Sequence, residues 1–161
     1  MARALIVGCG CRGRELAWEL RAAGPAVRGT PRDREHLAEI EAAGAEAVLA
    51  DPNRLGTLMR ELNGVSLVCW LMGSAEGDTA ADLHGPRLRT LLERLVDTPV
   101  RGVVYEAAGS LAPELLAGGA AAVREASLTW SIPAEVVEAD PRDPEAWLAA
   151  MTAAVNRLIE M

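Results

Sequence analysis

The sequence contains no lysine, because all 16 of its Lys and Arg residues are arginines. Schiff-base chemistry is therefore excluded, since it needs a lysine amine, and no lysine can lower the pKa of a catalytic tyrosine. Tyrosine occurs once, as Tyr105. Any acid–base chemistry must therefore use other side chains or this single phenol.

Long apolar runs and paired cysteines are also scarce. No uninterrupted apolar stretch approaches the ~18 residues that a membrane span needs, and the N-terminus lacks the layout of a signal peptide. The 3 cysteines, Cys9, Cys11 and Cys69, are odd in number, and none has a metal-site spacing with a histidine. We therefore expect a cytoplasmic protein without a membrane partner, a bound metal or a disulfide framework.

Length and charge point to one compact unit with an uneven charge distribution. A chain of 161 residues fits a single domain, 1–161, that can bury its own core. The net charge is −7, yet many of the arginines fall within the first 34 residues. Such a basic segment concentrates anionic ligands, whereas the acidic remainder argues against nucleic acid as a partner.

A glycine-rich turn of the pattern G-x-G-x-x-G joins an apolar run, 3–7, to a helical pattern over 14–23. In such a turn Gly8 permits the tight bend, Gly10 lets a diphosphate approach the backbone, and Gly13 lets the helix pack on the strand. The helix start then offers unpaired N–H groups to the phosphates. The residues predicted to bind a dinucleotide here are Gly8, Cys9, Gly10, Cys11, Arg12 and Gly13.

The end of the second strand candidate, 26–29, should read the adenosine ribose, because it lies about 20 residues beyond the turn. A carboxylate there would bind the ribose hydroxyls and repel a 2′-phosphate. The chain has Arg28, Thr30 and Arg32 instead. We therefore predict that these three residues contact the cofactor and that the cofactor is NADP rather than NAD.

The rest of the chain alternates apolar strand-length runs with helical patterns. Further strands are expected at 45–50, 65–72, 100–106 and 128–132, and helices at 32–43, 55–63, 88–96, 113–126 and 144–159. Repeated strand–helix units specify a parallel sheet with right-handed crossovers. We predict an α/β, doubly wound Rossmann fold with strand order 3-2-1-4-5-6, whose binding crevice lies where the order reverses.

The turn, 7–13, and the segment Val27-Arg28-Gly29-Thr30-Pro31-Arg32 resemble the opening of short-chain dehydrogenases/reductases, in their extended or atypical branch. NAD-dependent epimerase-like and NmrA-like NADP-binding proteins are the nearest types. The resemblance implies that Asp51 contacts the adenine and that Leu71, Met72 and Gly73 line the cofactor channel. It also implies that 130–133, as part of the sixth strand, passes the nicotinamide end.

The resemblance fails at the catalytic groups. The family's reductases carry Tyr-x-x-x-Lys on the helix after strand 5, and this chain has neither residue there. No segment of this sequence resembles the family's C-terminal substrate region either. Three weaker catalytic candidates remain, each capable of acid–base or hydrogen-bond chemistry: Ser110 after strand 5, His84 at the mouth of the crevice, and Tyr105 within strand 5.

Several interpretations stay open at this point. The protein is an NADP-dependent oxidoreductase of unknown substrate, or a non-enzymatic NADP(H) sensor. An S-adenosylmethionine methyltransferase-like domain is a third interpretation, although Arg28 stands where such proteins have an acid. Cys9 and Cys11 either make the turn a redox-sensitive site or simply fit a crowded turn. The leucine-rich helix 88–96 packs in the core or in a homodimer.

Overall fold

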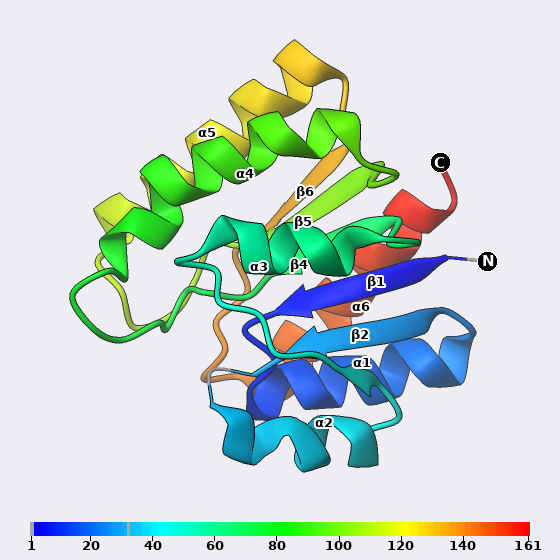
Figure 1. Ribbon diagram of the computed structural model, residues 1–161. Helices are drawn as coiled ribbons and strands as arrows, with labels where there is room; N and C mark the ends of the chain where they lie inside the picture. The colour runs from blue at the N-terminus through cyan, green and yellow to red at the C-terminus, as the bar shows by residue number, and fades with distance from the viewer. Residues whose placement is uncertain (1, 32) are drawn as a thin grey trace.

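The computed structural model describes residues 2–31 and 33–161 and contains a 6-stranded sheet in the order β3-β2-β1-β4-β5-β6 (Figure 1). Every neighbouring pair of strands is parallel. The predicted doubly wound α/β fold is therefore confirmed. The strands are β1 (Arg3–Val7), β2 (Ala26–Thr30), β3 (Glu46–Ala47), β4 (Leu67–Trp70), β5 (Gly102–Glu106) and β6 (Ala134–Val137).

Helices make all the long connections between these strands, as parallel pairing requires. The α-helices are α1 (Cys11–Ala23), α2 (Leu37–Ala42), α3 (Leu55–Met59), α4 (Pro86–Arg94), α5 (Pro113–Trp130) and α6 (Pro144–Ile159). Short 3₁₀ turns adjoin several of them: η1 (Arg34–His36), η2 (Arg60–Leu62), η3 (Ala81–His84) and η4 (Leu95–Asp97). Among the described residues, no helix is both long and apolar enough to cross a membrane.

The helices cover both faces of the sheet, so the central strands are apolar on both sides. One core cluster joins Leu5, Val68 and Val103 of the strands to helices α3, α4 and α5. The other joins Ile6 and Val104 to helices α1, α2 and α6. Successive strand residues thus alternate between two cores, which is why β1, β4 and β5 read as continuous apolar runs.

The strand order reverses beside β1, which pairs with β2 on one edge and with β4 on the other. In open parallel sheets the crevice at such a reversal, beyond the carboxyl ends of the strands, is where ligands bind. Val7 lies level with Thr30 of β2 and with Trp70 of β4. The three segments that follow these residues therefore meet at one place.

The sixth strand differs from its prediction. The apolar stretch 128–132 was expected to form it, but α5 continues to Trp130 and ends at Ser131, whose φ is 57°. Leu128 is 86% exposed, so this apolar side chain does not belong to the core. The strand begins at Ala134, after Pro133, and the expected passage of 130–133 along the nicotinamide end is corrected with it.

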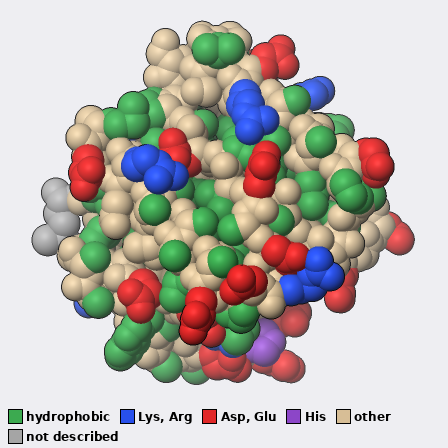
Figure 2. Space-filling view, turned by 180° about the vertical axis from the view of Figure 1, so that it is seen from behind, with side chains coloured by type: hydrophobic (Ala, Val, Ile, Leu, Met, Phe, Trp, Pro, Cys, Tyr) green, Lys and Arg blue, Asp and Glu red, His purple; other side chains and the backbone are tan. Residues whose placement is uncertain are grey.

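The molecular surface carries charged side chains of both signs. On the face opposite to the view of Figure 1, arginine side chains stand apart from one another among acidic and apolar ones (Figure 2). Exposed pairs such as Arg142 with Asp140, at 2.7 Å, are typical of this surface. Ion pairs of this kind add little to stability, because both partners stay hydrated.

Candidate functional site

The glycine turn leaves β1 in a conformation that favours glycine at its first position. Gly8 has a φ of +83°, and a Cβ there would collide with the backbone carbonyl of Leu71. The Cys9 amide donates to the Thr30 carbonyl at 2.8 Å, and the Gly10 amide donates to the Gly8 carbonyl at 2.8 Å. The turn is thereby fixed against the ends of β2 and β4.

Gly10 and Gly13 have different surroundings. A Cβ on Gly13 would lie 3.4 Å from both Cys9 Sγ and Ile6 Cγ2, within van der Waals contact, so α1 packs close to β1 at this position. Gly10 has a φ of −84°, open to any residue, and a Cβ there would meet nothing within 4 Å. Neither backbone strain nor packing explains a glycine at position 10. The space beside it suits a ligand that must contact the backbone.

Helix α1 opens toward this space without a side-chain cap. Its first intrahelical bond runs from the Arg14 amide to the Gly10 carbonyl at 2.8 Å, so the preceding amides, 11–13, lack intrahelical acceptors. The first turn holds no acidic residue, and Gly10 as the N-cap provides no side-chain acceptor. The positive end of the helix dipole therefore faces the cleft and favours an anion there.

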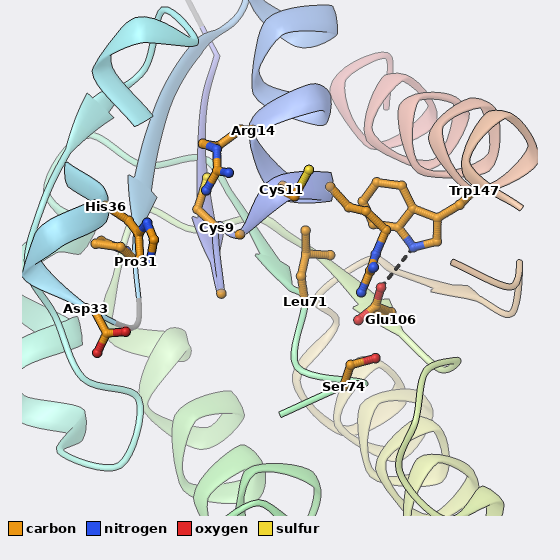
Figure 3. Close-up of a pocket in the computed structure, with 14 residues that line it drawn as sticks. Cys9, Cys11, Arg14, Pro31, Asp33, His36, Leu71, Ser74, Glu106 and Trp147 are labelled. Carbon is orange, nitrogen blue, oxygen red and sulfur yellow. Dashed lines mark hydrogen bonds between the residues drawn. The ribbon is translucent and has the colours of Figure 1, made fainter. Parts of the chain in front are cut away.

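A cleft of about 370 Å³ extends to both sides of the turn (Figure 3). On the β2 side it is lined by Arg14, Pro31, Asp33 and His36. On the β4 and β5 side it is lined by Leu71, Ser74, Glu106 and Trp147. The turn residues of the cleft lie between these two groups: Gly8, Cys9, Gly10, Cys11, Arg12 and Gly13.

A second hollow, of about 400 Å³, adjoins the cleft at Pro31. Its wall includes Asp51 and Met72, two of the predicted cofactor residues. Asp51 Oδ1 accepts the Asn53 amide at 2.9 Å, which closes the turn into α3. The Asn53 side-chain oxygen is buried and has no hydrogen-bond partner among the described residues.

Glu106 places a carboxylate inside the cleft at the end of β5. It is 2% exposed, and its two oxygens accept hydrogen bonds from the Gly73 amide at 2.9 Å and from the Trp147 indole N–H at 2.8 Å (Figure 3). Burial raises the pKa of Glu106, while these two bonds and the charge of Arg12 oppose the rise. Trp147 stands in the first turn of α6, which Asp143 caps by accepting the Ala146 amide.

Arg28 does not lie where the sequence predicted. Its Nε contacts Glu46 Oε2 at 3.0 Å, and its Nη1 donates to the carbonyls of Glu61 and Asn63 at 2.6 and 3.1 Å. The side chain is held between β3 and η2, because Arg28 is level with Glu46 inside the sheet. The predicted contact of Arg28 with a 2′-phosphate is therefore corrected: Arg28 joins three segments of the fold.

The two other predicted ribose-reading residues have different outcomes. Thr30 is 1% exposed and closes β2, and its carbonyl supports the turn instead of its side chain entering the cleft. Arg32 lies outside the described residues. Asp33, one position further, carries a carboxylate into the cleft, which the sequence prediction did not anticipate.

The three catalytic candidates lie away from the cleft lining. His84 is 3% exposed, and its Nδ1 accepts the Tyr105 hydroxyl at 2.5 Å while its Nε2–H donates to the Met72 carbonyl at 2.7 Å. His84 is thus in the core, not at the mouth of the crevice. Burial lowers the pKa of His84 and raises that of Tyr105. Ser110 is exposed, four positions after the end of β5, and its amide donates to Ser74 Oγ at 3.1 Å.

The cysteines of the turn differ in environment. Cys9 is buried against Gly29 and Gly13, and burial raises its pKa to about 12. Cys11 is exposed and lines the cleft. Cys9 therefore serves packing in a crowded turn and does not carry a thiolate near neutral pH. Within 2–31 and 33–161, no group of His, Cys, Asp and Glu could hold a metal ion.

Solved structures with this fold are numerous, although no family model and no curated protein matches the sequence. A putative NAD-dependent epimerase/dehydratase from Bacillus halodurans aligns with a TM-score of 0.70 and 17% identity, over 87% of this chain and 71% of that one. Citrobacter sp. triphenylmethane reductase, solved with NADP(H), aligns with a TM-score of 0.65 and 22% identity, over 84% of this chain and 48% of that one. Vestitone reductase from alfalfa aligns with a TM-score of 0.63 and 14% identity, over 84% of this chain and 56% of that one.

These likenesses confirm the predicted resemblance at the level of the fold. The chain shares a Rossmann-like α/β fold with these proteins, and its glycine turn lies at the strand reversal. It spans about half the length of triphenylmethane reductase and vestitone reductase. These likenesses define the fold, whereas the ligand and any reaction need their own argument.

Sequence reasoning missed Glu106 and Trp147 as residues of the cleft. Both fall in predicted regular elements, the strand 100–106 and the helix 144–159, and both elements are present. One signal was present: an acidic residue closes an otherwise apolar strand at the carboxyl edge of the sheet. Side chains at that edge border the crevice, so Glu106 could have been a site candidate.

Proposed function

We propose that this protein binds a nicotinamide dinucleotide, NADP(H), in the cleft around the glycine turn. The observation that carries the proposal is the open space beside Gly10, which no intramolecular requirement explains. The amides of 11–13, which lack intrahelical acceptors, would hold the diphosphate, and Arg12 would add a positive charge. Bound there, the nicotinamide supplies hydride chemistry.

The adenosine half would extend toward β2 and the adjoining hollow. Pro31 borders both the cleft and the hollow, and Asp51 and Asn53 line the hollow. Asp51 would support this end by fixing the turn that holds Asn53. The nicotinamide half would then extend past Leu71 toward Glu106 and Trp147.

The preference for NADP over NAD now depends on fewer residues than the sequence suggested. Arg28 is engaged elsewhere, and Asp33 would repel a 2′-phosphate. Arg14 lines the cleft, although it pairs with Glu39 at 3.1 Å. We keep NADP as the proposal, with Arg14 and Arg32 as the residues that would bind the 2′-phosphate.

The proposed reaction is an oxidoreduction that does not use Tyr105, His84 or Ser110 as its acid. None of the three lines the cleft. Consumption of NADPH with a panel of carbonyl compounds separates an oxidoreductase from a non-enzymatic sensor, because a sensor binds without turnover. A homodimer and a location in the cytoplasm stay predictions of the sequence.

Calorimetric titration tests the binding proposal directly. The purified protein is titrated with NADPH, NADH and S-adenosylmethionine. We expect saturable binding of NADPH at one site per chain, weaker binding of NADH, and no heat from S-adenosylmethionine. Binding of S-adenosylmethionine alone would replace the proposal with the methyltransferase-like interpretation, and no binding of either dinucleotide would remove it.

A further inference from the structure

The two halves of the cleft carry different groups, and the strand order fixes which half is which. Pro31, Asp33 and His36 follow β2, and Glu106 closes β5 on the other side of β1. In this class of fold the segment after β2 reads the adenosine ribose. A dinucleotide whose diphosphate lies on the turn therefore directs its other half toward β4, β5 and Glu106.

Glu106 is built to hold a negative charge at that end. Each carboxylate oxygen faces one N–H donor, from Gly73 at 2.9 Å and from Trp147 at 2.8 Å. A protonated acid would turn its O–H toward one of these donors, so the ionised form fits the two bonds better. The donors come from the end of β4 and from α6, which fix the carboxylate in place.

The carboxylate is nearly removed from solvent, being 2% exposed, yet it borders the cleft. A buried charge interacts strongly with whatever occupies the space beside it, because little water screens the field. On this side of the turn, among the lining residues that the structure describes, Glu106 is the acidic side chain and Arg12 the basic one.

The oxidised nicotinamide ring carries a positive charge, and the reduced ring is neutral with nearly the same outline. Shape therefore discriminates poorly between the two, whereas a fixed charge discriminates well. Resting on the proposed function, we infer that Glu106 makes this cleft select the oxidised dinucleotide, NADP⁺, over NADPH. The carboxylate attracts the cationic ring and gains nothing from the neutral one.

The expected selectivity is about tenfold. An opposite charge within a few ångströms shifts a carboxylate equilibrium by about one to three pKa units, and by reciprocity the same coupling acts on the cationic ligand. We take the lower limit because Arg12 acts in the opposite sense. One pKa unit corresponds to about a tenfold change in affinity.

The test is a pair of calorimetric titrations of the whole chain with NADP⁺ and NADPH at pH 8. The wild-type protein should bind NADP⁺ about tenfold more tightly, and Glu106→Gln should bring the ratio of the two dissociation constants close to one. Asp33→Asn is the matched control: it removes a carboxylate from the other half of the cleft and should change both affinities by the same factor.

Each outcome separates this inference from the proposed function. Binding of both forms with equal affinity by the wild type would overturn the selectivity and leave dinucleotide binding intact. A ratio unchanged in folded Glu106→Gln would show that another group causes it, and would overturn the role of Glu106. Absence of binding to both forms would remove the proposed function itself. The wild-type ratio needs no variant, so equal affinities for the two forms would overturn the inference even where Glu106→Gln does not fold.

Discussion

Two adjacent glycines in α5, Gly118 and Gly119, should respond in opposite directions to the same substitution. A Cβ on Gly118 would meet nothing within 4 Å, whereas a Cβ on Gly119 would collide with the hydroxyl of Tyr105. That hydroxyl is fixed by its bond to His84 in the core. The helix therefore needs glycine at one position and merely tolerates it at the other.

The magnitudes follow from these contacts. Gly118→Ala should stabilise the protein by about 1 kcal/mol, the difference in helix propensity between the two residues. Gly119→Ala has the same gain, but overpacking costs about 1 to 3 kcal/mol and a broken Tyr105–His84 bond about 0.5 to 1.5 kcal/mol. Its net effect is a loss of about 2 kcal/mol, so the two variants should differ by about 3 kcal/mol in free energy of unfolding.

Thermal and urea unfolding of the two variants measure this difference. For a chain of this size 1 kcal/mol corresponds to a change in Tm of about 2 to 4 °C, so Gly118→Ala should melt above the wild type and Gly119→Ala below it. Equal Tm values for the two variants would refute the reasoning, because they would mean that Tyr105 does not occupy the space beside Gly119.

Three further predictions follow from single contacts. Arg28→Met should lower the free energy of unfolding by about 2 to 4 kcal/mol, since it leaves two backbone carbonyls without a donor. The ratio of NADPH to NADH affinity should stay unchanged in titrations of this variant. A selective loss of NADPH binding would contradict this prediction. Because burial lowers the pKa of His84, the unfolded chain takes up a proton near pH 6.5 before the folded chain does. Urea unfolding should therefore show that the stability due to His84 is complete above about pH 6.5 and falls below it by up to about 1.4 kcal/mol per pH unit; an equal pH slope in folded His84→Gln would count against it. Mass spectrometry after iodoacetamide treatment of the folded protein at pH 8 should find label on exposed Cys11 and not on Cys9, whose pKa is raised to about 12; equal labelling would show that Cys9 is accessible.

The fold could be predicted from the sequence because its determinants are local or general. The apolar run before Gly8 and the helical pattern after it specify strand, turn and helix within one short stretch. The alternation of such units along the chain, with right-handed crossovers, then leaves few sheet orders. Strand 6 was misplaced because Leu128 and Trp130 give the stretch 128–132 an apolar pattern although both side chains are exposed at the end of α5. The sequence pattern alone does not show which apolar side chains are buried.

The candidate site was predictable where backbone geometry defines it and not where side chains meet across the fold. Gly10 could be assigned from its place in a motif. Arg28 could not, because its partners Glu46, Glu61 and Asn63 lie on segments whose approach depends on the tertiary structure. Glu106 is a single acid at a strand end, and its bond to Trp147 joins residues that are 41 positions apart.

The most direct test of the central claim is the affinity of Gly10→Val for NADPH, measured by calorimetry. A valine fits the open space and the φ of −84° at this position, so the variant should keep the wild-type circular dichroism spectrum and Tm. Its methyl groups would occupy the place proposed for the diphosphate, so we predict that NADPH binding is lost, while Gly118→Ala binds as the wild type does. Undiminished NADPH binding by a folded Gly10→Val protein would contradict the account.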